Sequence, residues 1–93
     1  MIFSTPFQKR VYEAVKKIPR GQVLSYQEVA GRLGELGAAR AVGNALNRNF
    51  NKEVPCHRVV RSDGSVGGYR RGTAKKIEIL KKEGVKIING KIY

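Results

Sequence analysis

The first apolar stripe of the chain has the period of an α-helix. Five apolar positions follow 3.6-residue spacing: Phe7, Val11, Ala14, Val15 and Ile18. Thr5 and Gln8 match a capping box around Pro6, which suits the first helical position. Because Pro19-Arg20-Gly21 does not continue a helix, the pattern predicts one helix between Thr5 and Pro19.

Two further short helices are predicted next. Ser25-Tyr26-Gln27-Glu28 is a capping box that opens a helix ending near Gly34. A third helix, over about Ala38–Asn47, is rich in alanine and glycine. Two short helices joined by a glycine-containing turn form either a helix-turn-helix, with the second helix reading DNA, or an ordinary corner between packed helices.

The last third of the chain combines short strands with one helix. Val59-Val60 is typical of a buried strand, and Asp63-Gly64 of a turn. A helix is predicted over Thr73–Glu83, capped by its threonine, and Asn89-Gly90 then predicts a type I′ hairpin. Four lysines of that helix are expected on its outer face: Lys75, Lys76, Lys81 and Lys82. The fold class is mainly α with small β elements, as one winged helix-turn-helix-like domain over residues 1–93.

Charge points to a polyanionic partner. The chain has 19 Lys+Arg against 7 Asp+Glu, a net charge of +12. Nucleic acid is the first candidate, and the alternative is a basic protein that binds nothing specific. The sequence shows no signal-peptide pattern and no long apolar run, and its single cysteine excludes an intrachain disulfide. We expect a cytoplasmic monomer that does not bind membranes.

The only cysteine and the only histidine stand side by side, at Cys56 and His57. A thiolate is a strong nucleophile, and nearby positive charge favours it. The alternative is a cysteine that merely fills the core. No second pair of soft ligands stands at zinc-like spacing, and the glycine-rich loop at residues 66–72 lacks the Lys-Ser/Thr ending of a phosphate-binding loop. We therefore expect neither a metal nor a cofactor.

The sequence around Cys56 and His57 resembles a known active-site motif. Pro55-Cys56-His57-Arg58-Val59-Val60 is similar to the motif of the O6-alkylguanine-DNA alkyltransferases. The resemblance extends over roughly residues 5–84 through four further stretches: residues 22–30, 39–43 with Asn49, 64–69, and 76–84. It implies the C-terminal catalytic and DNA-binding domain of that family without the N-terminal domain.

The resemblance also implies a reaction and its residues. Family members move an alkyl group irreversibly from O6 of guanine in duplex DNA to their own cysteine. Cys56 would be that acceptor and His57, through a water, its base. Four further catalytic roles follow: Glu83 orients the histidine, Tyr26 and Lys76 protonate or polarise the departing guanine, and Asn49 braces the turn before the active site.

Two sets of substrate contacts are implied in the same way. The base pocket would be formed by Val59, through its carbonyl, and by Gly67, Gly68 and Tyr69. The DNA is entered from the minor groove, where Arg40 fills the gap left by the flipped nucleotide. The remaining DNA contacts would be Ala38, Ala39, Gly43, Ala45, Arg48 and Arg70.

The chain departs from the family pattern in one loop. The segment between Asn49 and Cys56 is one residue shorter than usual and is polar at Phe50–Glu53, where an apolar run is common. Two alternatives to the repair enzyme therefore stay open. One is a lesion sensor like the alkyltransferase-like proteins, which typically lack the cysteine, and the other is a plain winged-helix DNA-binding protein.

Overall fold

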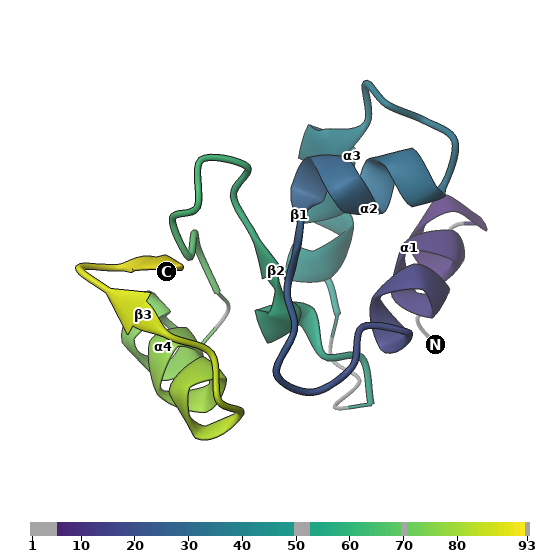
Figure 1. The fold of residues 1–93 in the computed structure, drawn as a ribbon. Helices are drawn as coiled ribbons and strands as arrows, with labels where there is room; N and C mark the ends of the chain where they lie inside the picture. The colour runs from purple at the N-terminus through teal and green to yellow at the C-terminus, as the bar shows by residue number, and fades with distance from the viewer. Residues whose placement is uncertain (1–5, 50–52, 70, 93) are drawn as a thin grey trace.

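The structure is a computed structural model that describes residues 6–49, 53–69 and 71–92 (Figure 1). The elements in chain order are α1 (Pro6–Lys16), β1 (Leu24–Ser25), α2 (Tyr26–Arg32), α3 (Ala39–Asn47), the 3₁₀ turn η1 (Cys56–Arg58), β2 (Val59–Val60), α4 (Thr73–Lys82), β3 (Ile87–Ile88) and β4 (Lys91–Ile92). The predicted helices are confirmed to within two residues at the described ends. The Thr5 cap lies outside the described residues.

The helical half, residues 6–49, packs α1, α2 and α3 around one apolar cluster. Val11, Val15, Val29 and Val42 are fully buried there, so the stripe predicted for α1 does face the core. The capping box at the start of α2 is confirmed: the Glu28 N–H donates to Ser25 Oγ at 3.0 Å, and the Ser25 N–H donates to Glu28 Oε1 at 2.9 Å. Sequence alone thus determines where α2 begins.

The carboxyl half, residues 53–92, has its own smaller cluster. Its buried members are Val60, Val66, Leu80, Val85 and Ile87. The hairpin of β3 and β4 is confirmed, and Asn89 and Gly90 have φ of 53° and 75°, as a type I′ turn requires at both central positions. The cap predicted for α4 is wrong: the N-cap is Gly72, and Thr73 Oγ1 instead donates to the Gly67 carbonyl at 3.4 Å.

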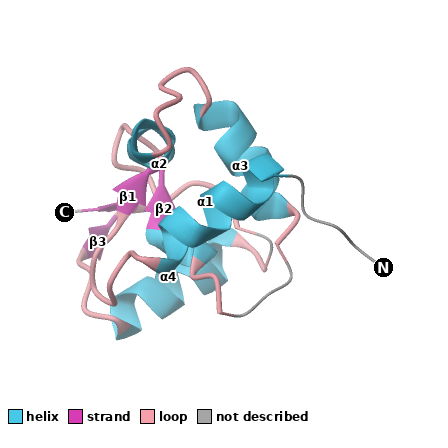
Figure 2. Cartoon of the chain, turned by 90° about the vertical axis from the view of Figure 1, so that its right-hand side faces the viewer, coloured by secondary structure: helices cyan, strands magenta, loops and turns pink. Residues whose placement is uncertain are grey.

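A parallel pair of two-residue strands joins the halves. Leu24 pairs with Val59 and Ser25 with Val60. The pair places the first residue of α2, Tyr26, beside the strand that follows Cys56. In Figure 1, β1 and β2 lie between the helices α1–α3 and the pair α4 and β3; in Figure 2 the two strands stand next to each other by α2. Short helices with few short strands confirm the predicted fold class, with α2 and α3 as its helix-turn-helix pair.

Candidate active site at Cys56

Cys56 opens the 3₁₀ turn η1 directly after Pro55, and its side chain is partly buried. The Cys56 N–H donates to the Val54 carbonyl at 2.8 Å. The same carbonyl accepts a contact of 3.4 Å from Nδ2 of Asn49, which is 7% exposed. The Asn49 amide therefore connects the end of α3 to the residues that hold the sulfur.

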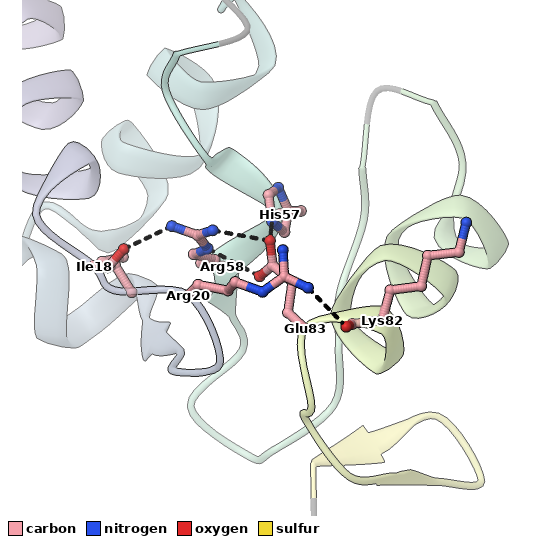
Figure 3. Close-up of polar contacts among 6 residues, drawn as sticks. All are labelled: Ile18, Arg20, His57, Arg58, Lys82 and Glu83. Carbon is pink, nitrogen blue, oxygen red and sulfur yellow. Dashed lines mark hydrogen bonds and ion pairs between the residues drawn. The ribbon is translucent and has the colours of Figure 1, made fainter.

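The tight turn places His57 and Arg58 on one carboxylate (Figure 3). His57 Nε2 lies 3.0 Å from Glu83 Oε2, and Arg58 donates to both oxygens of Glu83, from Nε at 2.9 Å and from Nη2 at 2.8 Å. Only 8% of the Glu83 side chain is exposed. Hydrogen bonds from Arg58, and then from His57, lower the pKa of Glu83 to about 2 against the opposing effect of burial. Glu83 is thus a buried anion.

This contact selects the histidine tautomer. An ionised carboxylate only accepts hydrogen bonds, so the His57 nitrogen facing it carries the proton. In neutral His57, Nδ1 is then the acceptor. A further proton can therefore enter only at Nδ1, and the imidazolium that forms is stabilised by Glu83.

The carboxylate also sits at the junction of the two halves. Arg58 Nη1 donates to the Ile18 carbonyl at 2.8 Å, and Arg20 Nη2 donates to the Lys82 carbonyl at 3.0 Å (Figure 3). Gly21, with φ of 87°, comes so close that a Cβ there would lie 3.0 Å from the Glu83 carbonyl oxygen. The loop after α1 is therefore fitted against the end of α4.

Lys76 is fully buried, which corrects its predicted position on the outer face of α4. Its ammonium donates to the Val59 carbonyl at 2.6 Å and to the Gly68 carbonyl at 3.2 Å. Loss of solvation lowers its pKa to about 8, against the opposing attraction of a charged Cys56. The helical pattern of apolar and charged residues predicted the wrong position for Lys76, because the two carbonyls solvate its ammonium inside the fold.

Tyr26 lies between α3, the glycine loop and Lys76. Its ring centroid is 6.0 Å from the Lys76 ammonium. A Cβ on Gly43 would be 3.7 Å from the Tyr26 ring, and one on Gly67 would be 3.7 Å from its hydroxyl. Burial raises the Tyr26 pKa, Arg61 lowers it, and a charged Cys56 raises it. The structure thus brings Tyr26, Lys76 and Gly67 together within the electrostatic influence of Cys56.

A charged Cys56 also affects the pKa of two more tyrosines. Burial first and the charge of Cys56 next raise the pKa of both Tyr69 and Tyr12. Sequence reasoning named Tyr69 and missed Tyr12, whose hydroxyl donates to the Ala45 carbonyl at 2.7 Å. The available signal was its place on the edge of the apolar stripe of α1, next to Val11.

The predicted DNA contacts are distributed unevenly over α3. Arg40 and Arg48 are exposed, and Ala38 and Ala39 are half-buried, so all four can meet a ligand. Ala45 is 3% exposed and belongs to the core cluster, on the face of α3 that packs inward; its contact with DNA stays a prediction. Arg70 lies outside the described residues.

Comparison with known proteins now bears on this arrangement. Residues 6–85 match the family model described as 6-O-methylguanine DNA methyltransferase, DNA binding domain. The chain belongs to this family. A methylated-DNA–protein-cysteine methyltransferase from Methanothermobacter thermautotrophicus is 49% identical over 84 residues, which are 89% of this chain and 47% of that protein. The chain therefore spans about half the length of this curated relative.

Solved structures of two kinds share the fold. The crystal structure of Mycobacterium tuberculosis OGT in complex with DNA matches with a TM-score of 0.85 and 42% identity, over 90% of this chain and 52% of that one. The structure of S. pombe ATL in complex with DNA matches with a TM-score of 0.81 and 34% identity, over 98% of this chain and 90% of that one.

The residues that match the family model include the whole predicted site but not the whole structure. Every predicted site residue falls within the matched residues 6–85, whereas the hairpin of β3 and β4 lies beyond them. Among the described residues, no three His, Cys, Asp or Glu side chains gather as a metal site would require. No helix in that part of the chain is both long and apolar enough to cross a membrane.

Proposed function

We propose that the protein repairs duplex DNA by transferring an alkyl group from O6 of guanine to Cys56, once per molecule. The observation that carries the proposal is the contact between His57 Nε2 and the buried Glu83 carboxylate, at 3.0 Å, directly beside the only cysteine. A nucleophile, a base and a third group that orients the base form the minimal set for activating a thiol.

The bonding changes balance with these residues. The Sγ–C bond forms as the O6–C bond of the lesion breaks, and the bonding electron pair leaves with the guanine. The thiol proton passes through a water to His57 Nδ1, and the resulting cation rests on Glu83. The departing guanine anion takes a proton from Tyr26 or Lys76. Lys76 suits this role because its lowered pKa, about 8, makes it a better donor than an ordinary lysine.

Access to the lesion requires base flipping, since the reactive carbon is stacked inside the duplex. Arg40, exposed on α3, fills the gap left by the everted nucleotide, while Ala38, Ala39 and Gly43 let the helix approach the minor groove. The net charge of +12 supplies attraction to phosphate. In this proposal residues 6–85 form a complete catalytic and DNA-binding unit, the C-terminal domain of the longer relatives.

The test follows the lesion over time at several ratios of DNA to protein. A duplex with one O6-methylguanine is mixed with protein, from excess protein to excess DNA, and the fraction restored to guanine is measured. Restoration that saturates at one lesion per protein molecule supports the proposal. The Cys56→Ser variant should restore no guanine, although it should still bind DNA. Wild-type protein that binds the lesion yet restores none of it would refute the proposal.

A matched pair of lysine variants tests the proton donor. Lys76→Met removes the buried ammonium at similar volume, and Lys75→Met makes the same change one residue away at an exposed, surface-paired side chain. We expect the transfer rate to fall about 100-fold in Lys76→Met, since general acid catalysis typically contributes that much, and to stay within about twofold in Lys75→Met. Equal rates in the two variants would remove Lys76 from the mechanism.

One observation favours a second candidate function. The S. pombe ATL structure matches this chain with a TM-score of 0.81, close to the 0.85 of M. tuberculosis OGT. A related S. pombe structure is described as Atl1 in complex with damaged DNA containing O6-carboxymethylguanine. The second candidate is therefore a lesion binder that marks alkylated guanine without repairing it. Tight, selective lesion binding with an unmodified Cys56 would establish it.

A further inference from the structure

The hairpin beyond the family-matched residues is joined to the glycine loop of the proposed active site. The Ile92 N–H donates to the Gly64 carbonyl at 2.7 Å, and the Val66 N–H donates to the Gly90 carbonyl at 3.0 Å. Ser65 and Lys91 pair as an antiparallel bridge. The loop is thus attached to the outer edge of the hairpin by one isolated bridge and two main-chain hydrogen bonds.

The same loop is held at its next residues by side chains of the carboxyl half. The Gly67 carbonyl accepts from Thr73 Oγ1 at 3.4 Å, and the Gly68 carbonyl accepts from the buried Lys76 ammonium at 3.2 Å. A Cβ at Gly67 would lie 3.2 Å from Cγ of Arg61. From residue 64 to residue 68 the backbone is therefore fastened in succession, first by β4 and then by α4.

Burial shows that the hairpin is docked and not merely adjacent. Ile87 is 9% exposed and Val66 is 2% exposed in the same cluster, and Ile92 packs against it. The other face of the hairpin carries Ile88, which is 52% exposed. An apolar inner face and a backbone edge thus both point toward the loop.

We propose that β4, through its main-chain pairing with residues 64–66, positions the glycine loop for the chemical step of alkyl transfer. The inference rests on the proposed function, because the loop provides Gly67, Gly68 and Tyr69 to the base pocket. The hairpin residues are positioning residues that never contact the lesion. Displacement of a binding loop by about 1 Å can lower a rate by about 100-fold even when the changed residue is remote.

The test separates the backbone bond from side-chain packing. Ile92→Pro removes the N–H that Gly64 accepts, whereas Ile92→Ala keeps that N–H and removes most of the side chain. Single-turnover transfer is measured across DNA concentrations at a temperature where circular dichroism shows both variants folded. We expect Ile92→Pro to lower the rate at saturating DNA at least about tenfold, with the half-saturating concentration unchanged, and Ile92→Ala to lower it no more than about twofold.

The outcomes are distinguishable from failure of the proposed function. A wild-type rate in folded Ile92→Pro, or equal losses in the proline and alanine variants, would overturn the role of the β4 backbone. If Ile92→Pro does not fold, Ile87→Ala weakens docking from the partner strand, and an unchanged saturated rate in that variant would overturn the inference. If wild-type protein binds the lesion without transferring the alkyl group, the readout becomes the affinity for the lesion duplex divided by that for undamaged duplex. Ile92→Pro should then lower this ratio, and an unchanged ratio would overturn the inference.

Discussion

The two halves of the molecule are held together by different physics. In the helical half the buried side chains are almost all aliphatic, and Val11, Val15, Val29 and Val42 are fully buried. In the carboxyl half a lysine is fully buried on two carbonyls, and an arginine and a histidine converge on a carboxylate that is 8% exposed. The half to which we assign DNA reading is thus built around an apolar core, and the half to which we assign the chemistry adds paired buried charges to its own smaller apolar cluster.

We therefore expect the two halves to respond to different perturbations. Apolar burial is non-directional and independent of pH, so it supports a stable platform for α3. A buried ion pair adds little net stability over an apolar replacement, but breaking it leaves an uncompensated charge. The role that we propose for His57 and Cys56 therefore explains the charges around Glu83 better than a need for stability does.

The largest effect is expected where the charge network is broken. Glu83→Gln keeps the shape of the side chain and leaves Arg58 and His57 without an anion, so the free energy of unfolding should fall by about 3–5 kcal/mol. Alkyl transfer should fall at least about 100-fold at a temperature where the variant is folded. The matched control is Glu78→Gln, which loses only exposed contacts to Lys75 and Lys82 and should change stability by less than about 0.5 kcal/mol. Urea titration and single-turnover kinetics measure both, and similar losses in the two variants would contradict the account.

The second prediction is a pH dependence confined to the carboxyl half. The pKa of Glu83 is about 2 in the folded protein against an ordinary value of 4.5, so its contribution is present above pH 4.5 and is lost as pH falls toward 2. The shift corresponds to about 3 kcal/mol. Lys76 acts in the opposite pH range: with a pKa of about 8 in place of 10.5, the native state binds fewer protons than the unfolded state between these values, and its contribution makes stability rise with pH there.

Chemical denaturation from pH 2 to pH 10 checks this dependence. Glu83→Gln should lack the loss below pH 4.5, and Lys76→Met should lack the rise above pH 8. An acid profile that is identical in wild type and Glu83→Gln would show that Glu83 is not the buried anion described above.

The third prediction sharpens the contrast from the apolar side. Leu46→Ala removes a side chain that is 5% exposed in the helical core, and the cavity should lower the free energy of unfolding by about 2–3 kcal/mol. This loss should be the same at pH 4 and pH 8, unlike that of Glu83→Gln. Calorimetry at the two pH values measures this loss of stability. A strongly pH-dependent loss in Leu46→Ala would contradict the distinction between the two halves.

The smallest expected effect lies at the start of α2. Ser25→Ala removes the hydroxyl that accepts the Glu28 N–H and should cost about 1 kcal/mol, as helix caps usually do. Ser25→Thr is the matched control because it keeps the hydroxyl. Thermal unfolding of the two variants decides whether the cap contributes as its geometry indicates.

Local patterns predicted the helices of the helical half and the hairpin turn of the carboxyl half well, because these features are encoded by short stretches of sequence. The period of α1, the capping box at Ser25 and the Asn89-Gly90 turn each depend on residues within a few positions of one another. The pairing of Leu24 with Val59, the bridge from Arg58 to Ile18, and the burial of Lys76 on Val59 involve partners 17 to 40 residues apart. No periodicity encodes such pairs.

The candidate site divides in the same way. Cys56 and His57 were evident from their adjacency, but nothing local separates Glu83 from a solvated helix-end carboxylate; only the resemblance to a family selected it. The structure adds that Arg58 binds Glu83 and the Ile18 carbonyl. Tyr12 escaped notice because its hydroxyl acts across 33 residues, on the last turn of α3.

The most direct measurement is the mass of the peptide that contains Cys56 after the protein has met a duplex with one O6-methylguanine. The account predicts that this peptide gains one methylene unit, in equal number to the guanines restored, and that no other peptide changes. An unmodified Cys56 peptide, recovered from protein that had bound the lesion and left it intact, would contradict the central claim.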